Sequence, residues 1–71
     1  MYMEVLSIID VSDTHDARTL MSLRVSNEVT VDVMCKYGYG SKKKKALWYV
    51  MDPVPEGVSQ TEVLQYAKSL E

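Results

Sequence analysis

Hydrophobic and polar residues alternate along much of this chain, which is the pattern of β-strands that bury one face. The most regular alternation runs from Val29 to Tyr37. Its apolar positions are Val29, Val31, Val33, Cys35 and Tyr37, and the positions between them are Thr30, Asp32, Met34 and Lys36. Because β-branched and aromatic residues also favour strands, we predict that this segment is a strand whose odd-numbered residues face the core.

Two further segments predict the first and last strands. Tyr2 to Val11 places Met3, Val5, Ile9 and Val11 on one face and Tyr2, Glu4, Leu6, Ile8 and Asp10 on the other. Lys45 to Met51 places Leu47, Tyr49 and Met51 on one side and Ala46, Trp48 and Val50 on the other. Pro53 and Pro55 then end the last strand, because proline donates no hydrogen bond to a ladder.

The segment Ala17 to Ser26 fits two templates. As a strand it places Met21, Leu23 and Val25 inside, with Leu20 as the misfit; as a helix capped by Asp13 it clusters Ala17, Leu20, Met21 and Val25, with Arg24 intruding. The strand agrees better with the segment that follows it. A three-residue loop from Ser26 to Glu28 would set Val25 opposite Val29, Leu23 opposite Val31 and Met21 opposite Val33. We therefore predict a strand and keep the helix as the alternative.

A helix is predicted near the C-terminus. Ser59 and Glu62 have the spacing of a capping box, in which each side chain satisfies an exposed amide of the other residue. The helix that begins there presents Val63, Leu64, Ala67 and Leu70 along one stripe, with Tyr66 beside it. The predicted fold is thus α+β, a small four-stranded antiparallel β-meander with one C-terminal helix packed on it. The alternative order is β-α-β-β-α.

The expected face of the sheet opposite the helix is unusually apolar. It would carry Tyr2, Leu6, Ile8, Leu20, Met34, Trp48 and Val50. So many large apolar groups are not expected on a bare face of a monomer. Either the sheet curls so that its first and last strands cover each other, or the protein forms a homodimer.

Composition bounds the protein to a single small domain, residues 1–71, with an ordinary hydrophobic fraction of 46%. One cysteine excludes an internal disulfide, which in so short a chain indicates a reducing compartment. No apolar run approaches the ~20 residues of a membrane span. We expect a cytoplasmic protein without a membrane partner.

Charge is distributed unevenly along the chain. The ten residues from Lys36 to Lys45 contain five lysines and no acidic residue, a formal charge of +5, whereas the remainder has three basic and ten acidic residues, or −7. The segment also holds two tyrosines and two of the three glycines. The predicted binding residues are Tyr37, Tyr39, Lys42, Lys43, Lys44, Lys45 and Trp48, in which aromatic side chains anchor a partner and lysines steer it.

Candidate catalytic groups are few. Ser12 to His15, after an apolar strand, resembles the first metal-binding motif of the calcineurin-like metallophosphoesterases, which implies Asp13 and His15 as ligands. His15 is the single histidine, so the later motifs of that family are missing, and a polar turn is the preferred interpretation. Cys35 lies on the inward register of its strand and is interpreted as a small buried hydrophobe. We predict no enzymatic activity, no metal and no cofactor.

Three functions fit these features. The preferred one is a non-catalytic protein-interaction module, such as a small inhibitor or accessory regulator of the kind made by phages and mobile elements, that binds a larger protein or nucleoprotein with an acidic surface. The first alternative is a nucleic-acid-binding module that uses the Lys36 to Lys45 loop, where lysines would neutralise phosphates and aromatic side chains would stack on bases. The second alternative is a structural homodimer.

Overall fold

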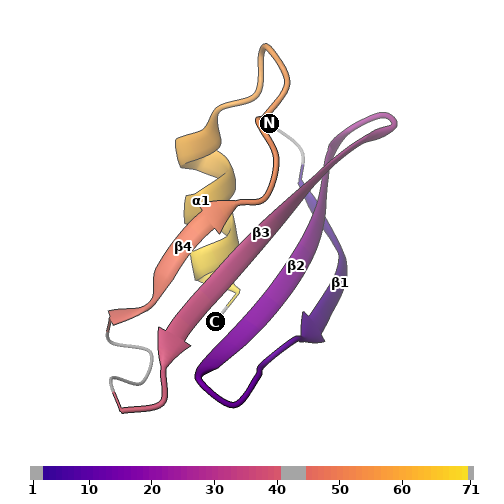
Figure 1. The fold of residues 1–71 in the computed structure, drawn as a ribbon. Helices are drawn as coiled ribbons and strands as arrows, with labels where there is room; N and C mark the ends of the chain where they lie inside the picture. Colours follow the sequence, from indigo (N-terminus) through magenta and orange to yellow (C-terminus); the bar gives the residue numbers. More distant parts are fainter. Residues whose placement is uncertain (1–2, 41–44, 71) are drawn as a thin grey trace.

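The computed structural model describes residues 3–40 and 45–70, which form one four-stranded sheet and one helix (Figure 1). The strands are β1 (Glu4–Asp10), β2 (Asp16–Ser26), β3 (Val29–Gly38) and β4 (Leu47–Val50), and the helix is α1 (Gln60–Ser69). All strand pairs are antiparallel and follow chain order, β1-β2-β3-β4. The predicted meander with a C-terminal helix is therefore confirmed, and residues 17–26 are a strand, which excludes the alternative β-α-β-β-α order.

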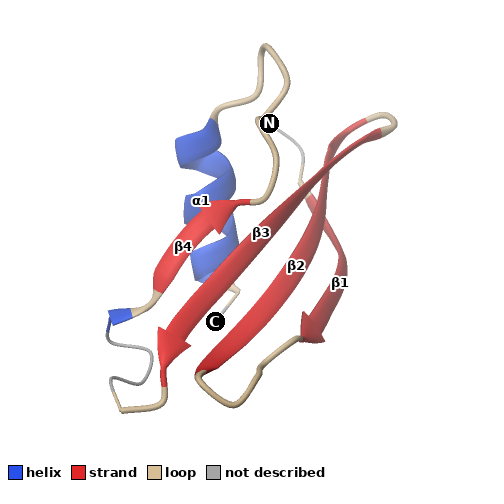
Figure 2. Cartoon of the chain, viewed as in Figure 1, coloured by secondary structure: helices blue, strands red, loops and turns tan. Residues whose placement is uncertain are grey.

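The core lies between α1 and one face of the sheet, which we call the inner face (Figure 2). Met21, Leu23 and Val33 of the sheet and Val63 and Ala67 of the helix are all buried there. These two helical residues belong to the predicted stripe, because positions four apart lie on one side of a helix. The helix begins as predicted at Ser59, whose Oγ accepts a hydrogen bond from the backbone N–H of Glu62 at 3.3 Å.

The hairpin of β2 and β3 has the predicted register in its centre but not at its turn. Leu23 pairs with Val31 and Met21 with Val33, as predicted. However, the predicted pairing of Val25 with Val29 is wrong, because Ser26 pairs with Val29 and Val25 is an extra residue in a β-bulge. Because the bulge adds one residue to β2, the turn can be short while Val25 still points inward, where it is buried in the core.

A second bulge corrects the prediction for β1. Val5 pairs with the inward Leu23, but the register shifts between Val5 and Ser7, so that Ile8 pairs with Met21 and Ile9 with Leu20. Directly opposite residues share a face. Ile8 is therefore on the inner face and Ile9 on the outer face, the reverse of the predicted assignment, because one extra residue inverts the alternation beyond it.

The two faces of β4 are also the reverse of the prediction. Trp48 pairs with Cys35 and Val50 with Val33, so both lie on the inner face, where they pack against the core. Both sides of this strand are apolar, and alternation alone therefore contained no information about which one faces the helix. Leu47 and Tyr49 point to the outer face instead.

The outer face carries a continuous apolar row across all four strands. Ile9 pairs with Leu20, Leu20 with Met34, and Met34 with Tyr49. We call these four residues the outer row. Met34 is buried to 8% exposure between its apolar neighbours, whereas Ile9 at the sheet edge is 49% exposed. The predicted outward positions of Leu20 and Met34 are thus confirmed, Leu6 lies at the β1 bulge, and Tyr2 is outside the described residues.

This face is not closed by the sheet itself. β1 and β4 are at opposite edges of the sheet order, so the predicted curling of the first strand onto the last one does not occur as a pairing. α1 lies on the other side (Figure 2).

Candidate binding surface at the loop end of the sheet

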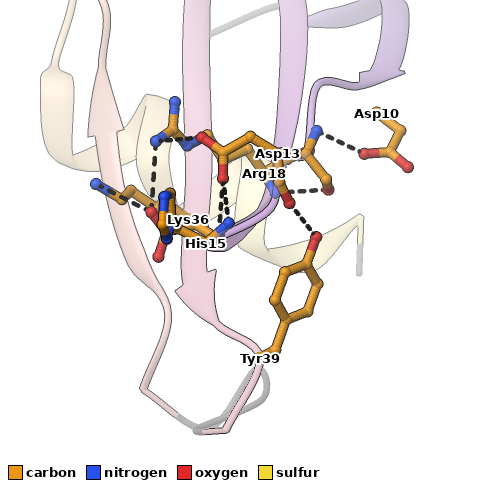
Figure 3. A network of polar contacts seen from close by, with 8 residues as sticks. Asp10, Asp13, His15, Arg18, Lys36 and Tyr39 are labelled. Atoms are coloured by element: carbon orange, nitrogen blue, oxygen red, sulfur yellow. Dashed lines mark hydrogen bonds and ion pairs between the residues drawn. The ribbon is translucent and has the colours of Figure 1, made fainter.

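Two connections meet at the end of the sheet where β2 begins and β3 ends (Figure 1). Asp16, the first residue of β2, pairs with Gly38, the last residue of β3. The turn before β2 therefore lies beside the segment after β3, and the Tyr39 hydroxyl donates a hydrogen bond to the backbone carbonyl of Asp13 at 2.6 Å (Figure 3). We call this region, residues 11–16 and 36–40 together with Lys45, the loop end.

The turn between β1 and β2 is held by its own side chains. Asp13 Oδ1 accepts hydrogen bonds from the backbone N–H groups of His15 and Asp16, both at 2.8 Å. Ser12 Oγ accepts from the backbone N–H of Arg18 at 2.9 Å, and Asp10 Oδ1 accepts from that of Ser12 at 2.9 Å. Short Ser and Asp side chains form such turns because they reach nearby backbone donors.

These hydrogen bonds act on the charged forms of two carboxylates. The backbone donors of Asp16 and His15 lower the pKa of Asp13 below its ordinary value, and the nearby Arg18 acts in the same direction. The hydroxyl and backbone amide of Ser12 likewise lower the pKa of Asp10. Both carboxylates are therefore ionised at neutral pH.

Three ion pairs connect the turn to the strands. Arg18 Nη2 lies 3.0 Å from Asp13 Oδ2 and 3.4 Å from Asp16 Oδ2, and Lys36 Nζ lies 3.7 Å from the same Asp16 oxygen (Figure 3). Because all four side chains are partly exposed, each pair contributes little to stability. The ion pairs mainly change the local charge, because the positive charge of Lys36 is partly compensated by the Asp16 carboxylate.

The structure separates the predicted binding residues into two groups. Tyr39, 53% exposed, and Lys45, also exposed, belong to the loop end. Tyr37 and Trp48 are half-buried on the inner face, where they are diagonal neighbours in the register of β3 and β4. The predicted lysines at 42–44 lie outside the described residues. Trp48 packs against the core and is thus turned away from the outer face on which it was expected.

The resemblance to a metallophosphoesterase motif has another explanation in the geometry. Both oxygens of Asp13 are engaged within the turn, by two backbone amides and by Arg18. Among residues 3–40 and 45–70 there is no group of three or more His, Cys, Asp or Glu side chains that could hold a metal ion, and no pocket. Cys35 is buried on the inner face, as its register predicted.

The contact between the β1–β2 turn and the segment after β3 was not predicted from the sequence, which was interpreted at residues 12–16 only as a polar turn. The register of the predicted β2–β3 hairpin already contained this information. If Met21 is opposite Val33, antiparallel pairing five residues further places Asp16 opposite Gly38, and the flanking residues must then be adjacent.

Comparison of the chain with protein-family models, curated proteins and solved structures finds no match to any of them. Among the described residues, no helix is long and apolar enough to cross a membrane.

Proposed function

We propose that this chain is a non-catalytic protein-interaction module that binds an acidic surface of a larger protein through its loop end. The observation that supports this proposal is the hydrogen bond from the Tyr39 hydroxyl to the Asp13 carbonyl. It fixes a half-exposed aromatic ring at the start of the basic loop, at the tip of two paired strands. A ring held in place in the free protein loses little conformational entropy on binding, which favours its use as an anchor.

The charges around this ring support steering. The Lys36 to Lys45 segment has a formal charge of +5 within an otherwise acidic chain. Positive charge concentrated in one short segment of the chain accelerates association with an acidic partner and orients the protein as it approaches. An inhibitor or accessory regulator that acts by occupying a partner's surface requires no more chemistry than this.

The acidic turn beside the loop disfavours nucleic acid as the ligand. Asp13 and Asp16 lie next to the start of the basic segment, where the Asp13 carbonyl accepts from Tyr39 and Asp16 forms ion pairs with Arg18 and Lys36. A phosphate backbone would meet these carboxylates, whereas a protein surface can place its own donors against them.

A photo-crosslinking amino acid in place of His15, an exposed side chain of the loop end, tests the proposal and leaves the Tyr39 hydrogen bond intact. In extracts of the cell that makes the protein, it should crosslink one protein species, and the yield should fall when Lys45 is replaced by Gln. The same probe at Gln65, an exposed position on α1, serves as the control. Equal crosslinking from both positions would reject the loop end as the binding surface. Crosslinks that vanish after nuclease treatment would instead support the nucleic-acid alternative.

A further inference from the structure

The outer row is flanked on its two sides by rows of opposite character. Towards the loop end, Arg18 pairs with Lys36, and Lys36 with Leu47. Val11 joins this row through the hydrogen bond from its backbone N–H to the Arg18 carbonyl. The charged side chains of this row, Arg18 and Lys36, are both positive, so we call it the basic row. Each is ion-paired with Asp16, and Arg18 also with Asp13, so these positive charges are partly compensated within the same copy.

The row on the other side of the outer row has the opposite charge. Ser7 pairs with Ser22, and Ser22 with Asp32. Met51 completes it at the β4 end, because its backbone N–H donates to the Asp32 carbonyl at 2.9 Å. We call this the acidic row. In the same direction, the outer face of β3 carries Asp32, Met34 and Lys36, and that of β4 and the residue after it carries Met51, Tyr49 and Leu47.

We infer that the outer face binds a second copy of this chain, related to the first by a two-fold axis parallel to the outer row. This symmetry sets the outer row of one copy on that of the other. It also reverses the strand direction, so that the basic row of each copy covers the acidic row of the other. Lys36 then faces Asp32 of the second copy and Leu47 faces Met51 of the second copy, twice in each dimer.

The charges select this axis over the other two-fold axis that stacks the two faces. An axis along the strands would place the basic row on the basic row, so that Arg18 of one copy would approach Lys36 of the other. Like charges brought together in an interface are strongly unfavourable. The inferred axis pairs opposite charges and apolar side chains at once, which is the self-complementarity that a two-fold interface requires.

The face has the shape and size for such packing. Two twisted sheets pack face to face at about −30° with roughly 10 Å between them. The molecule measures 38 × 20 × 18 Å along its principal axes, so a side that includes its long axis is of the order of the ~800 Å² that each partner of a standard interface buries. Leu47, 58% exposed, and Met51, 46% exposed, would lose most of their solvent contact.

The charged residues involved keep their present neighbours in this arrangement. Lys36 retains Asp16 and gains a second carboxylate, and Asp32 retains the Ser22 hydroxyl, which donates to its Oδ1 at 2.8 Å. Because the strands of the two copies run in opposite directions, the two loop ends point away from each other. The inference does not depend on the proposed function, but together they describe a bivalent protein.

Complementary substitutions at Leu47 and Met51 test the axis directly. Leu47→Asp and Met51→Lys each replace an exposed side chain, so both variants should fold. Alone, each should weaken self-association at least about tenfold, because it sets a charge against an apolar side chain at two places in the dimer. Mixed in equal amounts, they should form a heterodimer, in which one Leu47–Met51 contact is kept and the other becomes an ion pair. Sedimentation velocity of each variant and of the mixture measures this.

A second pair on β3 gives an independent readout. Asp32→Lys and Lys36→Asp should each be monomeric by like-charge repulsion and should associate when mixed. Gln65→Lys and Lys68→Glu, matched changes on exposed positions of α1, should leave the dimer intact. A monomeric wild type at ~100 μM, or mixtures that stay monomeric while the wild type dimerises, would overturn the inference. Neither result affects crosslinking from position 15, so the two proposals fail separately.

Discussion

The inner and outer faces of the sheet are built from the same four strands and are both apolar, but within residues 3–40 and 45–70 a helix covers only the inner one (Figure 2). On the inner face, Leu23 and Val33 meet Val63 and Ala67 and are fully buried. On the outer face, the side chains of the outer row are shielded from solvent only where they pack against one another. The ten-residue helix α1 covers one face of this sheet and leaves the other face without a helix among the described residues, so the two faces contribute differently. The inner face stabilises the fold, and the outer face is the one that we infer to bind a second copy.

Matched leucine truncations on β2 provide the largest expected effect. Leu23→Ala removes a fully buried side chain from the inner face and should destabilise the protein by about 2–5 kcal/mol, through lost burial and the cavity left behind. Leu20→Ala removes the same atoms from a partly exposed side chain of the outer row and should cost less than about 1 kcal/mol. Urea denaturation measures both.

Both truncations should be made in the Leu47→Asp variant, so that association through the outer face does not add to the measured stability. Equal losses from Leu23→Ala and Leu20→Ala would mean that the two faces contribute alike and that the inner-face assignment is wrong.

Removing the N-cap of α1 tests the contribution of the helix to the inner face, with a smaller expected loss of stability. Ser59→Ala removes the acceptor for the Glu62 backbone N–H and should reduce the free energy of unfolding by about 1 kcal/mol. Gln60→Ala, at an exposed position next to the cap, should leave stability nearly unchanged. The free energies come from urea titrations followed by circular dichroism. If the two variants behaved identically, the cap would not contribute to holding α1 on the sheet.

The turn of the β2–β3 hairpin carries a local strain that substitution can relieve. Glu28 has a φ of 63°, in the left-handed region where its Cβ is unfavourable. Glu28→Gly should therefore stabilise the protein by up to about 1 kcal/mol, although glycine also raises the entropy of the unfolded chain. Asn27→Gly is the control, because only the unfolded-state term applies there and it should destabilise. A thermal midpoint that falls for Glu28→Gly would contradict this account.

The predictable part of the fold was set by local chemistry. The cap at Ser59, the alternation of β3 and the pairing of Leu23 with Val31 each follow from a few neighbouring residues, and the structure confirms them. Agreement between hairpin register and hydrophobic pattern also decided correctly that residues 17–26 form a strand. Such local features required no knowledge of what the helix covers.

The errors have two physical causes. A β-bulge adds one residue without a distinct sequence signal, and those at Leu6 and Val25 inverted or shifted the assignments beyond them. In β4 both sides are apolar, so the choice of Trp48 and Val50 for the inner face was made by packing against α1. The outer row therefore became visible only with the pairing of all four strands.

The last and smallest effect concerns the loop end, where the two faces meet the β1–β2 turn. The pKa of Asp13 is lowered by the backbone donors of Asp16 and His15, so the folded protein favours the ionised carboxylate more than the unfolded chain does. This stabilisation is fully present above the unfolded pKa of about 3.9 and is lost as the pH falls through the lower folded pKa.

Asp13→Asn should therefore be less stable than the wild type at pH 7 and should approach it near pH 2. Thr14→Ala, in the same turn but without a titrating group, should shift the urea midpoint equally at both pH values. If the difference in stability between Asp13→Asn and the wild type stayed constant from pH 7 to pH 2, the charge of Asp13 would not stabilise the turn. The hydrogen bonds of the turn, independent of that charge, would then hold the Asp13 carbonyl in position for Tyr39.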